Sequence, residues 1–441
     1  MTYCKPILAL WLLLGTFAVQ AQLTTIDFER YTLDNGLTVL LHEDHSTPIV
    51  TVAVMYHVGS KDENPSRTGF AHFFEHLMFE GSKNIDRGEF AKMVERNGGA
   101  LNANTSRDRT YYYEILPSNQ LELGLWLESE RMLHAIVDEE GIETQREVVK
   151  EEKRQRFDNQ PYGRFQQELF QRAFREHPYR WPLIGSMDHL DAATEEDYKQ
   201  FYADYYVPNN ATLTITGDFA MDQTKQWVEK YFGDIPQGDP VVRNLPQEPA
   251  LEGEIRDTVY DNVQLPAVFM GYRMPALGTD DYYAIEMLNK ILSDGASSRL
   301  NRSLVEETQV ALGASAINFG LEDPGLGIVY SIANMGKTPA DMEEVINAEM
   351  ERVQDELVSE EEYQKIRNQI ENDLVYNVAS MAGIASNLST YEVMYGDANL
   401  INTEIERYLA VTREDMREAA RKYYHRDNRV VLYWLPNPAD Q

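Results

Sequence analysis

The clearest indication of chemical function in this sequence is one short run that contains two histidines and a glutamate. Residues 72–76 read His-Phe-Phe-Glu-His. On a helix, His72 and His76 lie four residues apart on one face, so both imidazoles can bind one zinc ion. Glu75 shares that face, where its carboxylate can reach a water molecule that zinc would activate. Such spacing is typical of zinc metallopeptidases, and chance gives roughly 0.01 matches in a chain of this size. A buried polar helix face is the alternative.

A catalytic zinc ion needs a third protein ligand and one open position. Cys4 is the only cysteine and precedes an apolar run, so a thiolate ligand is excluded and His, Asp or Glu is expected. A predicted helix over residues 143–157 offers four glutamates. Helical geometry alone does not choose among them, because neighbours such as Glu151 and Glu152 point about 100° apart. The four candidates are Glu143, Glu147, Glu151 and Glu152.

The first 21 residues have the features of an export signal. Lys5 supplies a positive start, residues 7–19 form an apolar run, and the small residues before the predicted cut after Ala21 suit a signal peptidase. The apolar run is too short to span a bilayer comfortably, although an uncleaved anchor is the alternative. We therefore expect a periplasmic or secreted protein.

Composition and charge narrow the class of protein further. Hydrophobic residues make up 43% of the 441 residues, as in packed globular proteins. The length exceeds that of one ordinary core and suits two domains. The formal net charge of −32 argues against nucleic acid as a partner, since phosphate binding needs basic clusters. It fits either an acidic interior that attracts basic peptides or simple solubility.

The second part of the chain repeats the first. Thr194-Glu195-Glu196-Asp197 begins a predicted helix that ends in Tyr-Tyr, and Thr412-Arg413-Glu414-Asp415 begins another, with every matched position 218 residues apart. In both copies an asparagine and a strand follow. Between the copies, residues 233–254 are rich in proline and charge, which is the composition of a linker. The repeat predicts two copies of one α+β unit.

The secondary structure expected in the first copy alternates between strands and helices. Apolar alternation around Asn35-Gly36 predicts a hairpin over residues 31–39. Periodicity predicts strands over residues 52–58, 100–106 and 110–116, and helices over residues 69–79, 87–97, 119–133 and 143–157. We assign a signal peptide to residues 1–21, a zinc-binding domain to 22–235, a linker to 236–255, and a domain without the zinc motif to 256–441.

The chain resembles the pitrilysin and mitochondrial-processing-peptidase family of inverted-motif zinc metallopeptidases, in particular its single-chain bacterial type. The resemblance covers nearly the whole chain after the signal segment. It is carried by residues 48–63, 68–82, 97–111, 146–152, 177–185 and 208–210.

This resemblance implies specific roles. Glu152, which ends the run that starts at Arg146, is the implied third ligand of one zinc ion per chain. An edge strand of Asn102, Ala103, Asn104 and Thr105 is implied to pair with an extended peptide substrate. The implied fold is two homologous α/β-sandwich halves, each an antiparallel-rich sheet with helices packed on it, that form a clam-like chamber.

Three positions depart from the family pattern. Gln145 replaces a second glutamate that many members carry, so a helper role there is weakened. Val305 and Leu312 stand where active members carry Arg and Tyr, and neither side chain can donate a hydrogen bond to a developing oxyanion. We therefore expect a zinc-bearing subunit whose paralogous partner supplies Arg and Tyr. The alternative is a non-catalytic structural or binding subunit. The scattered histidines, His57 and His177 among them, are expected to be structural.

Overall fold

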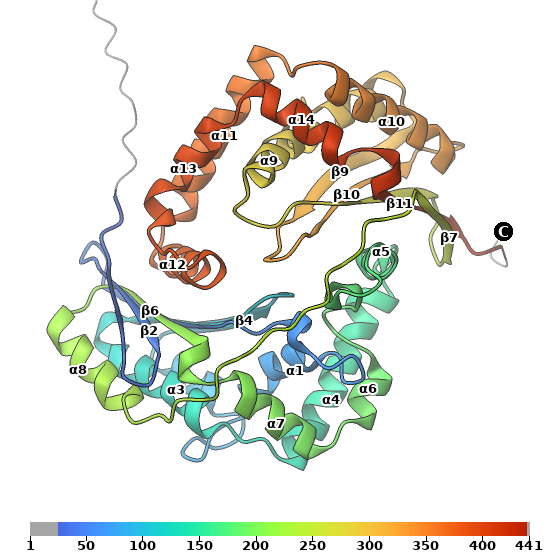
Figure 1. Ribbon diagram of the computed structural model, residues 1–441. Helices are drawn as coiled ribbons and strands as arrows, with labels where there is room; N and C mark the ends of the chain where they lie inside the picture. The colour runs from blue at the N-terminus through green and yellow to red at the C-terminus, as the bar shows by residue number, and fades with distance from the viewer. Residues whose placement is uncertain (1–24, 439–441) are drawn as a thin grey trace, which may run out of the picture.

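A computed structural model describes residues 25–438, which form two β-sheets with helices packed on them (Figure 1). The predicted signal peptide and Cys4 lie outside the described residues. Within residues 25–438, no helix combines the length and the apolar character needed to cross a membrane. We call residues 25–232 the first half and residues 255–438 the second half.

The sheet of the first half has six strands in the order β1-β2-β6-β3-β5-β4. Neighbouring strands are antiparallel except β2 and β6, which are parallel. The predicted hairpin turns at Asn35-Gly36, where Gly36 has φ +88°, a backbone conformation that glycine adopts without strain. The strands are β1 (Glu29–Thr32), β2 (Thr38–Glu43), β3 (Ile49–Tyr56), β4 (Ala100–Thr105), β5 (Thr110–Pro117) and β6 (Ala211–Gly217).

Helices of the first half cover the outer face of this sheet (Figure 1). Leucine, valine and aromatic side chains from both layers form one large buried core. The predicted helix at residues 143–157 begins earlier, at Glu139, because Asp138 caps it by accepting a hydrogen bond from Gly141 N. The helices are α1 (Phe70–Leu77), α2 (Phe90–Arg96), α3 (Leu121–His134), α4 (Glu139–Lys153), α6 (Met187–Ala192), α7 (Glu195–Tyr205) and α8 (Met221–Phe232).

The second sheet repeats the first, as the sequence repeat predicts. Its order, β7-β11-β8-β10-β9, matches β2-β6-β3-β5-β4, and its only parallel pair, β7 with β11, matches β2 with β6. Its strands are β7 (Ile255–Asp261), β8 (Ala267–Arg273), β9 (Ala311–Phe319), β10 (Leu326–Ala333) and β11 (Arg429–Pro436). Its helices are α9 (Asp280–Ser293), α10 (Pro339–Asp355), α11 (Glu360–Asn377), α12 (Met381–Tyr395), α13 (Leu400–Ala410) and α14 (Arg413–Tyr423).

The repeat extends to individual hydrogen bonds. Asn210 Nδ2 donates to Tyr205 O at 2.9 Å at the end of α7. Asn428 Nδ2 donates to Tyr423 O at 2.8 Å at the end of α14. Both asparagines therefore satisfy a helix-terminal carbonyl just before the next strand begins, which explains why they stand at the same offset in the sequence.

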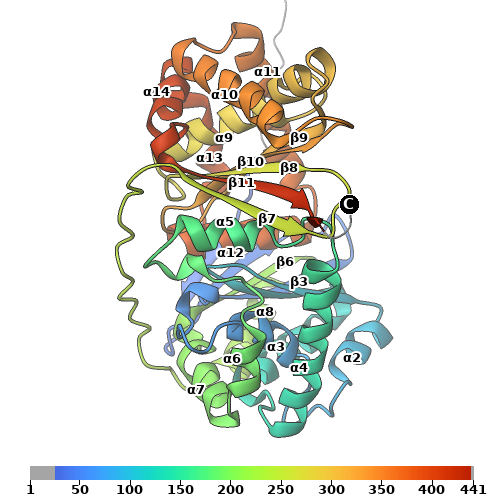
Figure 2. The same cartoon turned by 90° about the vertical axis from the view of Figure 1, so that its right-hand side faces the viewer.

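Each half sends one helix onto the sheet of the other (Figures 1 and 2). Helix α5 (Phe165–Ala173) of the first half packs Phe170 and neighbouring apolar residues against Phe269 and Trp434 of the second sheet. Helix α12 of the second half lies on β6 and β3, where Thr216 Oγ1 donates to Met381 O at 2.7 Å. The two halves therefore share buried surface on both sides of the molecule, a large stabilising term in folding.

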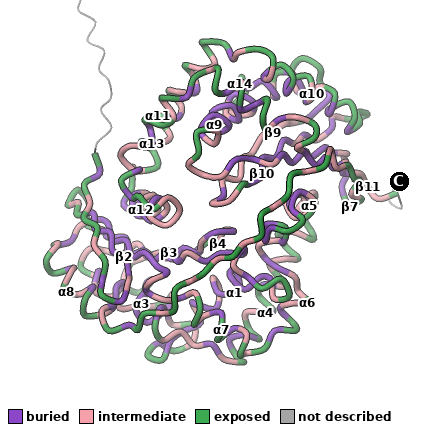
Figure 3. Tube along the Cα trace, in the orientation of Figure 1, coloured by how far each residue is buried: buried purple, intermediate pink, exposed green. Residues whose placement is uncertain are grey.

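Residues 236–254, which connect the halves, form no helix or strand and contain no buried residue (Figure 3). Two side chains nonetheless anchor the segment. Arg243 Nε lies 2.6 Å from Asp62 Oδ1. Glu248 accepts a hydrogen bond from His177 N at 2.7 Å and pairs with Arg273 of β8 at 2.8 Å. The connection is therefore fastened to both halves by charged contacts.

The start of α1 depends on a close approach of two glycines. Gly69, with φ +96°, precedes the helix, and Gly185, with φ +73°, lies against it. A Cβ atom added to Gly185 would meet Gly69 Cα at 2.3 Å, a distance that real side chains do not adopt. Only glycine therefore fits at residue 185 without displacing the beginning of α1.

We predict that Gly185→Ala lowers the free energy of unfolding by about 3 kcal/mol, because strain and a backbone clash act together. Gly88→Ala is the matched control: Gly88 has the same φ of +73°, but an added Cβ would contact nothing within 4 Å. That variant should lose only about 1 kcal/mol, the cost of the left-handed conformation. Urea denaturation of both variants measures the difference, and equal losses would contradict the packing argument.

Candidate metal centre

The structure brings His72 and His76 of α1 beside Glu152 of α4. Glu152 Oε2 lies 3.1 Å from His76 Nε2 and 3.4 Å from His72 Nε2. The two imidazole rings have centroids 4.9 Å apart. Among the described residues, this is the one group of three or more potential ligands whose ligand atoms all lie within 4.8 Å of one another.

These three side chains fit a zinc ion. Tetrahedral zinc with bonds of about 2.0–2.1 Å separates its ligand atoms by roughly 3.3 Å, close to both distances above. Glu152 Oε2 is buried and accepts no hydrogen bond from the described residues, so its contact with His76 is not that of an aligned donor and acceptor. Burial lowers the pKa of His72 to about 4, which leaves a neutral imidazole with a free lone pair.

The second oxygen of Glu152 has its own partner. Arg156 Nη1 lies 2.8 Å from Glu152 Oε1, so one oxygen faces the histidines while the other is held by a guanidinium. Arg156 lies in a π-helical turn, Arg154–Asp158, that follows α4 and directs this side chain back along the helix. Contact with His76 lowers the pKa of Glu152, and burial opposes that effect. The carboxylate is therefore oriented and ionised.

Glu75 lies on the side of α1 that faces the edge of the sheet. Thr105 Oγ1 of β4 donates a 2.6 Å hydrogen bond to Glu75 Oε2. Burial raises the pKa of Glu75, and the hydrogen bond from Thr105 opposes the rise. A carboxylate whose pKa is shifted toward neutrality is suited to accept a proton and then donate it.

Buried polar contacts hold α1 in place at both ends. Glu63 accepts hydrogen bonds from Gly69 N at 2.8 Å and Ala71 N at 2.9 Å, which satisfies two free donors at the helix N-terminus. Tyr112 of β5 donates to Phe74 O at 2.9 Å near the other end. These contacts fix the position of both histidines relative to the sheet.

The residues expected to bind substrate lie on β4, which is the last strand of its sheet. Asn102 and Asn104 are exposed, Ala103 is buried, and Thr105 contacts Glu75. Because β4 pairs only with β5, its other edge has backbone groups without a strand partner in the described sheet. An extended peptide could add to that edge as a further strand.

Gln145 and Arg146 serve the packing of α4. Gln145 Nε2 donates to Glu80, whose other oxygen lies 2.9 Å from Arg87 Nη1. Arg146 is buried and donates through Nε to Leu190 O at 3.0 Å, which ties α4 to α6. Neither residue belongs to the group of three ligands.

Val305 and Leu312 lie in the second half. Val305 is half-buried in a π-helical turn, Asn301–Glu307, and packs against the core of that half. Leu312, on β9, is 56% exposed, which is unusual for leucine. Its apolar side chain cannot donate a hydrogen bond.

The structure brings together His72, His76 and Glu152, the third of which only the family resemblance had singled out, and it adds contacts around them that sequence reasoning missed. Arg156 stands four residues after Glu152, a spacing that marks a helical ion pair and could have been recognised. The hydrogen bond from Thr105 to Glu75 joins residues 30 apart, and no local pattern signals it. Glu63, the cap of α1, stands outside the helix and gave no signal either.

Comparisons with known proteins show which family the chain resembles. Residues 38–186 match the family described as insulinase (peptidase family M16), and residues 192–370 match the one described as peptidase M16 inactive domain. The zinc protease PqqE of Helicobacter pylori is 31% identical over 412 residues, which is 92% of this chain and 93% of that protein.

Solved structures have the same fold. A protease from Helicobacter pylori superposes with a TM-score of 0.88 at 30% identity and covers 93% of this chain and all of that one. The periplasmic protease PqqL from Escherichia coli reaches a TM-score of 0.76 at 20% identity, over 93% of this chain but 48% of PqqL. At that identity PqqL shows the fold alone. On the strength of the Helicobacter relative and the two matched regions, this chain belongs to the insulinase family, peptidase family M16.

Proposed function

We propose that this protein is a zinc-dependent endopeptidase that hydrolyses extended or unfolded peptides. The observation that carries the proposal is the convergence of His72, His76 and Glu152, with Glu75 beside them on the same helix. Two imidazoles, one carboxylate and an open fourth position make up a catalytic rather than a structural zinc site. We infer that the chain binds one zinc ion.

Bound at these residues, zinc supplies a Lewis acid that activates water and polarises the scissile carbonyl. Glu75 accepts the proton of the attacking water and passes it to the leaving amine. Thr105 holds one oxygen of Glu75, which restricts the carboxylate to a defined orientation while the other oxygen remains available. His72 and His76 serve as ligands throughout the reaction.

The open edge of β4 accounts for substrate selection in this proposal. A peptide that pairs with Asn102, Ala103, Asn104 and Thr105 must be extended over several residues. Thr105 at the end of that strand contacts Glu75, so a peptide bound along β4 reaches the proton acceptor. Folded proteins should therefore be poor substrates.

A paralogous partner completes the site in this proposal. Val305 and Leu312 supply no donor to the oxyanion, and the loss of such a donor costs on the order of 100-fold in rate. A partner of the same family that carries Arg and Tyr would provide these donors. PqqL is about twice as long as the part that this chain matches, which leaves room for a second unit of similar size.

Export to the periplasm is part of the same proposal. The features of residues 1–21 support it, and PqqL, which shares the fold, is described as periplasmic.

A non-catalytic structural or binding subunit is the second candidate function. Val305 and Leu312 favour it, because neither side chain can donate a hydrogen bond to an oxyanion. The complete group of ligands in the first half argues against it, because a scaffold needs no open metal position.

Mass-spectrometric analysis of a mixed peptide library tests the peptidase. We predict that Glu75→Gln reduces cleavage at least about 1,000-fold, because the proton acceptor is lost, while the zinc content stays the same. Glu151→Gln is the matched control, since Glu151 is exposed on α4 and is not one of the three grouped ligands. Equal cleavage by wild type and Glu75→Gln would refute the assigned role of Glu75.

Metal analysis tests the ligands directly. We predict that His76→Ala falls from about one zinc per chain to nearly none, because two remaining ligands hold zinc poorly. His45→Ala serves as the control, since His45 is exposed between Glu43 and Asp218 and lies apart from the group. Full retention of zinc in His76→Ala would place the metal elsewhere.

Reconstitution tests the need for a partner. We predict that a paralogue with Arg and Tyr at the positions of Val305 and Leu312 raises the cleavage rate about 100-fold. The control is the same paralogue with Met and Phe there, neither of which donates a hydrogen bond, and it should bind but fail to activate. Full activity of the mature chain as a monomer would contradict the pairing, whereas zinc-loaded but inactive complexes would favour the scaffold.

A further inference from the structure

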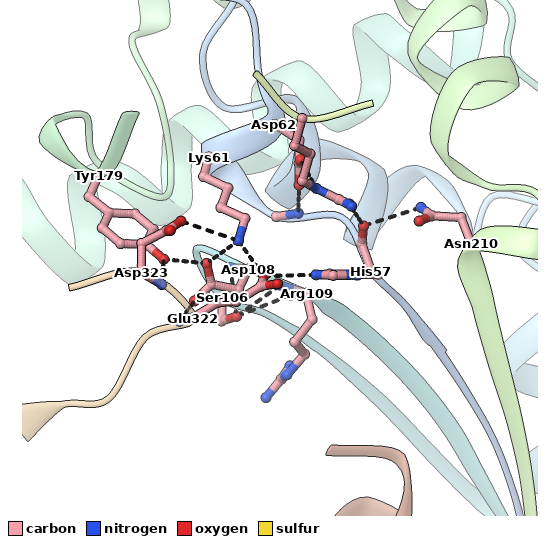
Figure 4. Close-up of polar contacts among 12 residues, drawn as sticks. His57, Lys61, Asp62, Ser106, Asp108, Arg109, Tyr179, Asn210, Glu322 and Asp323 are labelled. Atoms are coloured by element: carbon pink, nitrogen blue, oxygen red, sulfur yellow. Dashed lines mark hydrogen bonds and ion pairs between the residues drawn. The ribbon is translucent and has the colours of Figure 1, made fainter. Parts of the chain in front are cut away.

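A loop of the second half reaches the hairpin that carries Thr105. Residues 320–325 join β9 to β10, and two acidic residues of this loop, Glu322 and Asp323, contact the first half (Figure 4). The contacts form around Lys61, whose side chain is only 1% exposed. A lysine buried this deeply requires paired carboxylates to offset the cost of removing its charge from water.

The carboxylates around Lys61 come from both halves. Lys61 Nζ lies 2.9 Å from Asp108 Oδ1 of the first half and forms an ion pair with Glu322 Oε2 of the second. Burial alone would raise the pKa of Glu322, but His57 and Lys61 lower it to about 2. His57 Nε2 lies 2.8 Å from the same oxygen of Glu322. Glu322 is therefore ionised at neutral pH and holds two groups of the first half.

Asp108 also bonds to the backbone of the loop and to Tyr179. Its Oδ2 accepts a hydrogen bond from Glu322 N at 3.2 Å, and its Oδ1 accepts one from Tyr179 at 2.5 Å. The Tyr179 hydroxyl in turn accepts from Asp323 N at 3.1 Å. The loop therefore bonds to Asp108 and Tyr179 through its backbone, in addition to the contacts of its side chains with Lys61 and His57.

Asp108 lies in the turn between β4 and β5, so the cluster fixes that turn. Asp108 N donates to Ser106 Oγ at 3.1 Å, and Arg107 O accepts from Lys61 N at 2.9 Å. The guanidinium of Arg107 stacks 3.6 Å from the ring of Phe170 on α5. Thr105, the residue that donates to Glu75, immediately precedes this turn.

We propose that Glu322 is a positioning residue for the peptidase reaction. Through Lys61 and Asp108 it holds the β4–β5 turn so that Thr105 orients Glu75 and the open edge of β4 stays in register with the metal. The inference rests on the proposed peptidase function. It gives the second half a part in the active site although Val305 and Leu312 donate nothing.

A purely structural interface makes a different prediction. If Glu322 only joined the halves, its loss would lower stability without changing the catalytic step of the folded protein. The ion pair of Arg172 on α5 with Asp257 on β7, 2.6 Å long, provides the comparison. It also joins the halves, but it is partly exposed and has no contact with the β4–β5 turn among the hydrogen bonds of the described residues.

The test is a double-mutant cycle on the mature, zinc-loaded chain, with its partner if cleavage requires one. Glu322→Gln should lower kcat about tenfold with zinc content unchanged, because a displaced carboxylate no longer meets the attacking water. Thr105→Val should also lower kcat. The double variant should be no slower than the slower single variant, because both act on Glu75 through one contact. Asp257→Asn should leave kcat unchanged.

Hydrogen–deuterium exchange of residues 100–110 provides a readout that does not depend on activity. Glu322→Gln should speed exchange there, and Asp257→Asn should not. Glu322→Asp keeps the charge on a shorter side chain and should give intermediate values, and it replaces Glu322→Gln if that variant fails to fold. Unchanged kcat and exchange, or independent effects of Thr105→Val and Glu322→Gln, would overturn the proposal. Absence of cleavage by wild type would refute the peptidase, and the exchange measurement would still decide the positioning role.

Discussion

The candidate metal site depends on one contact, in which a buried carboxylate oxygen of Glu152 is directed at two imidazoles of a neighbouring helix. This oxygen lies 3.1 and 3.4 Å from His76 and His72 without an aligned hydrogen bond, an arrangement that is costly for a buried acceptor unless a cation joins the three groups. Glu63 and Tyr112 fix α1, Arg146 fixes α4, and Arg156 fixes the second oxygen. These surrounding contacts hold the three side chains in an arrangement that suits a metal site.

The duplication explains both the symmetry of the chain and its asymmetry in chemistry. The two sheets share strand order and direction, so the chain contains the same architecture twice. In the first half, the segment between β3 and β4 contains α1 with its two histidines. In the second half, the corresponding segment between β8 and β9 contains α9, which has no histidine, and the turn with Val305. The second half retains the fold, exchanges a helix with the first, and directs Glu322 to the turn beside Thr105.

Sequence reasoning succeeded where the signal was local or periodic. The helix that spaces His72 and His76, the turn at Asn35-Gly36 and the helix starts at Thr194 and Thr412 are each set by a few adjacent residues, and each is found as expected. The fold of two homologous halves followed from the repeat. Placing β4 at the edge of its sheet required the family resemblance, because a strand sequence does not say which neighbour it lacks.

What the sequence could not supply were contacts between distant segments. Glu322 and Lys61 are 261 residues apart, and the exchange of α5 and α12 depends on how complete halves pack together. Single charged residues in loops are common, so neither Lys61 nor Glu322 stood out before the structure showed that one is buried and the other reaches it. His57 was expected to be structural. Its contact with Glu322 identifies the residue of the second half that it binds.

The metal site is tested most directly by a crystal structure of the Glu75→Gln variant with zinc and an extended peptide, recorded with anomalous diffraction at the zinc edge. We expect one anomalous peak within bonding distance of His72 Nε2, His76 Nε2 and Glu152, at roughly 2.0–2.2 Å. We also expect the peptide to pair with the open edge of β4. A zinc ion held by other residues, or a peptide bound away from β4 with the metal site distant from its backbone, would contradict the proposal.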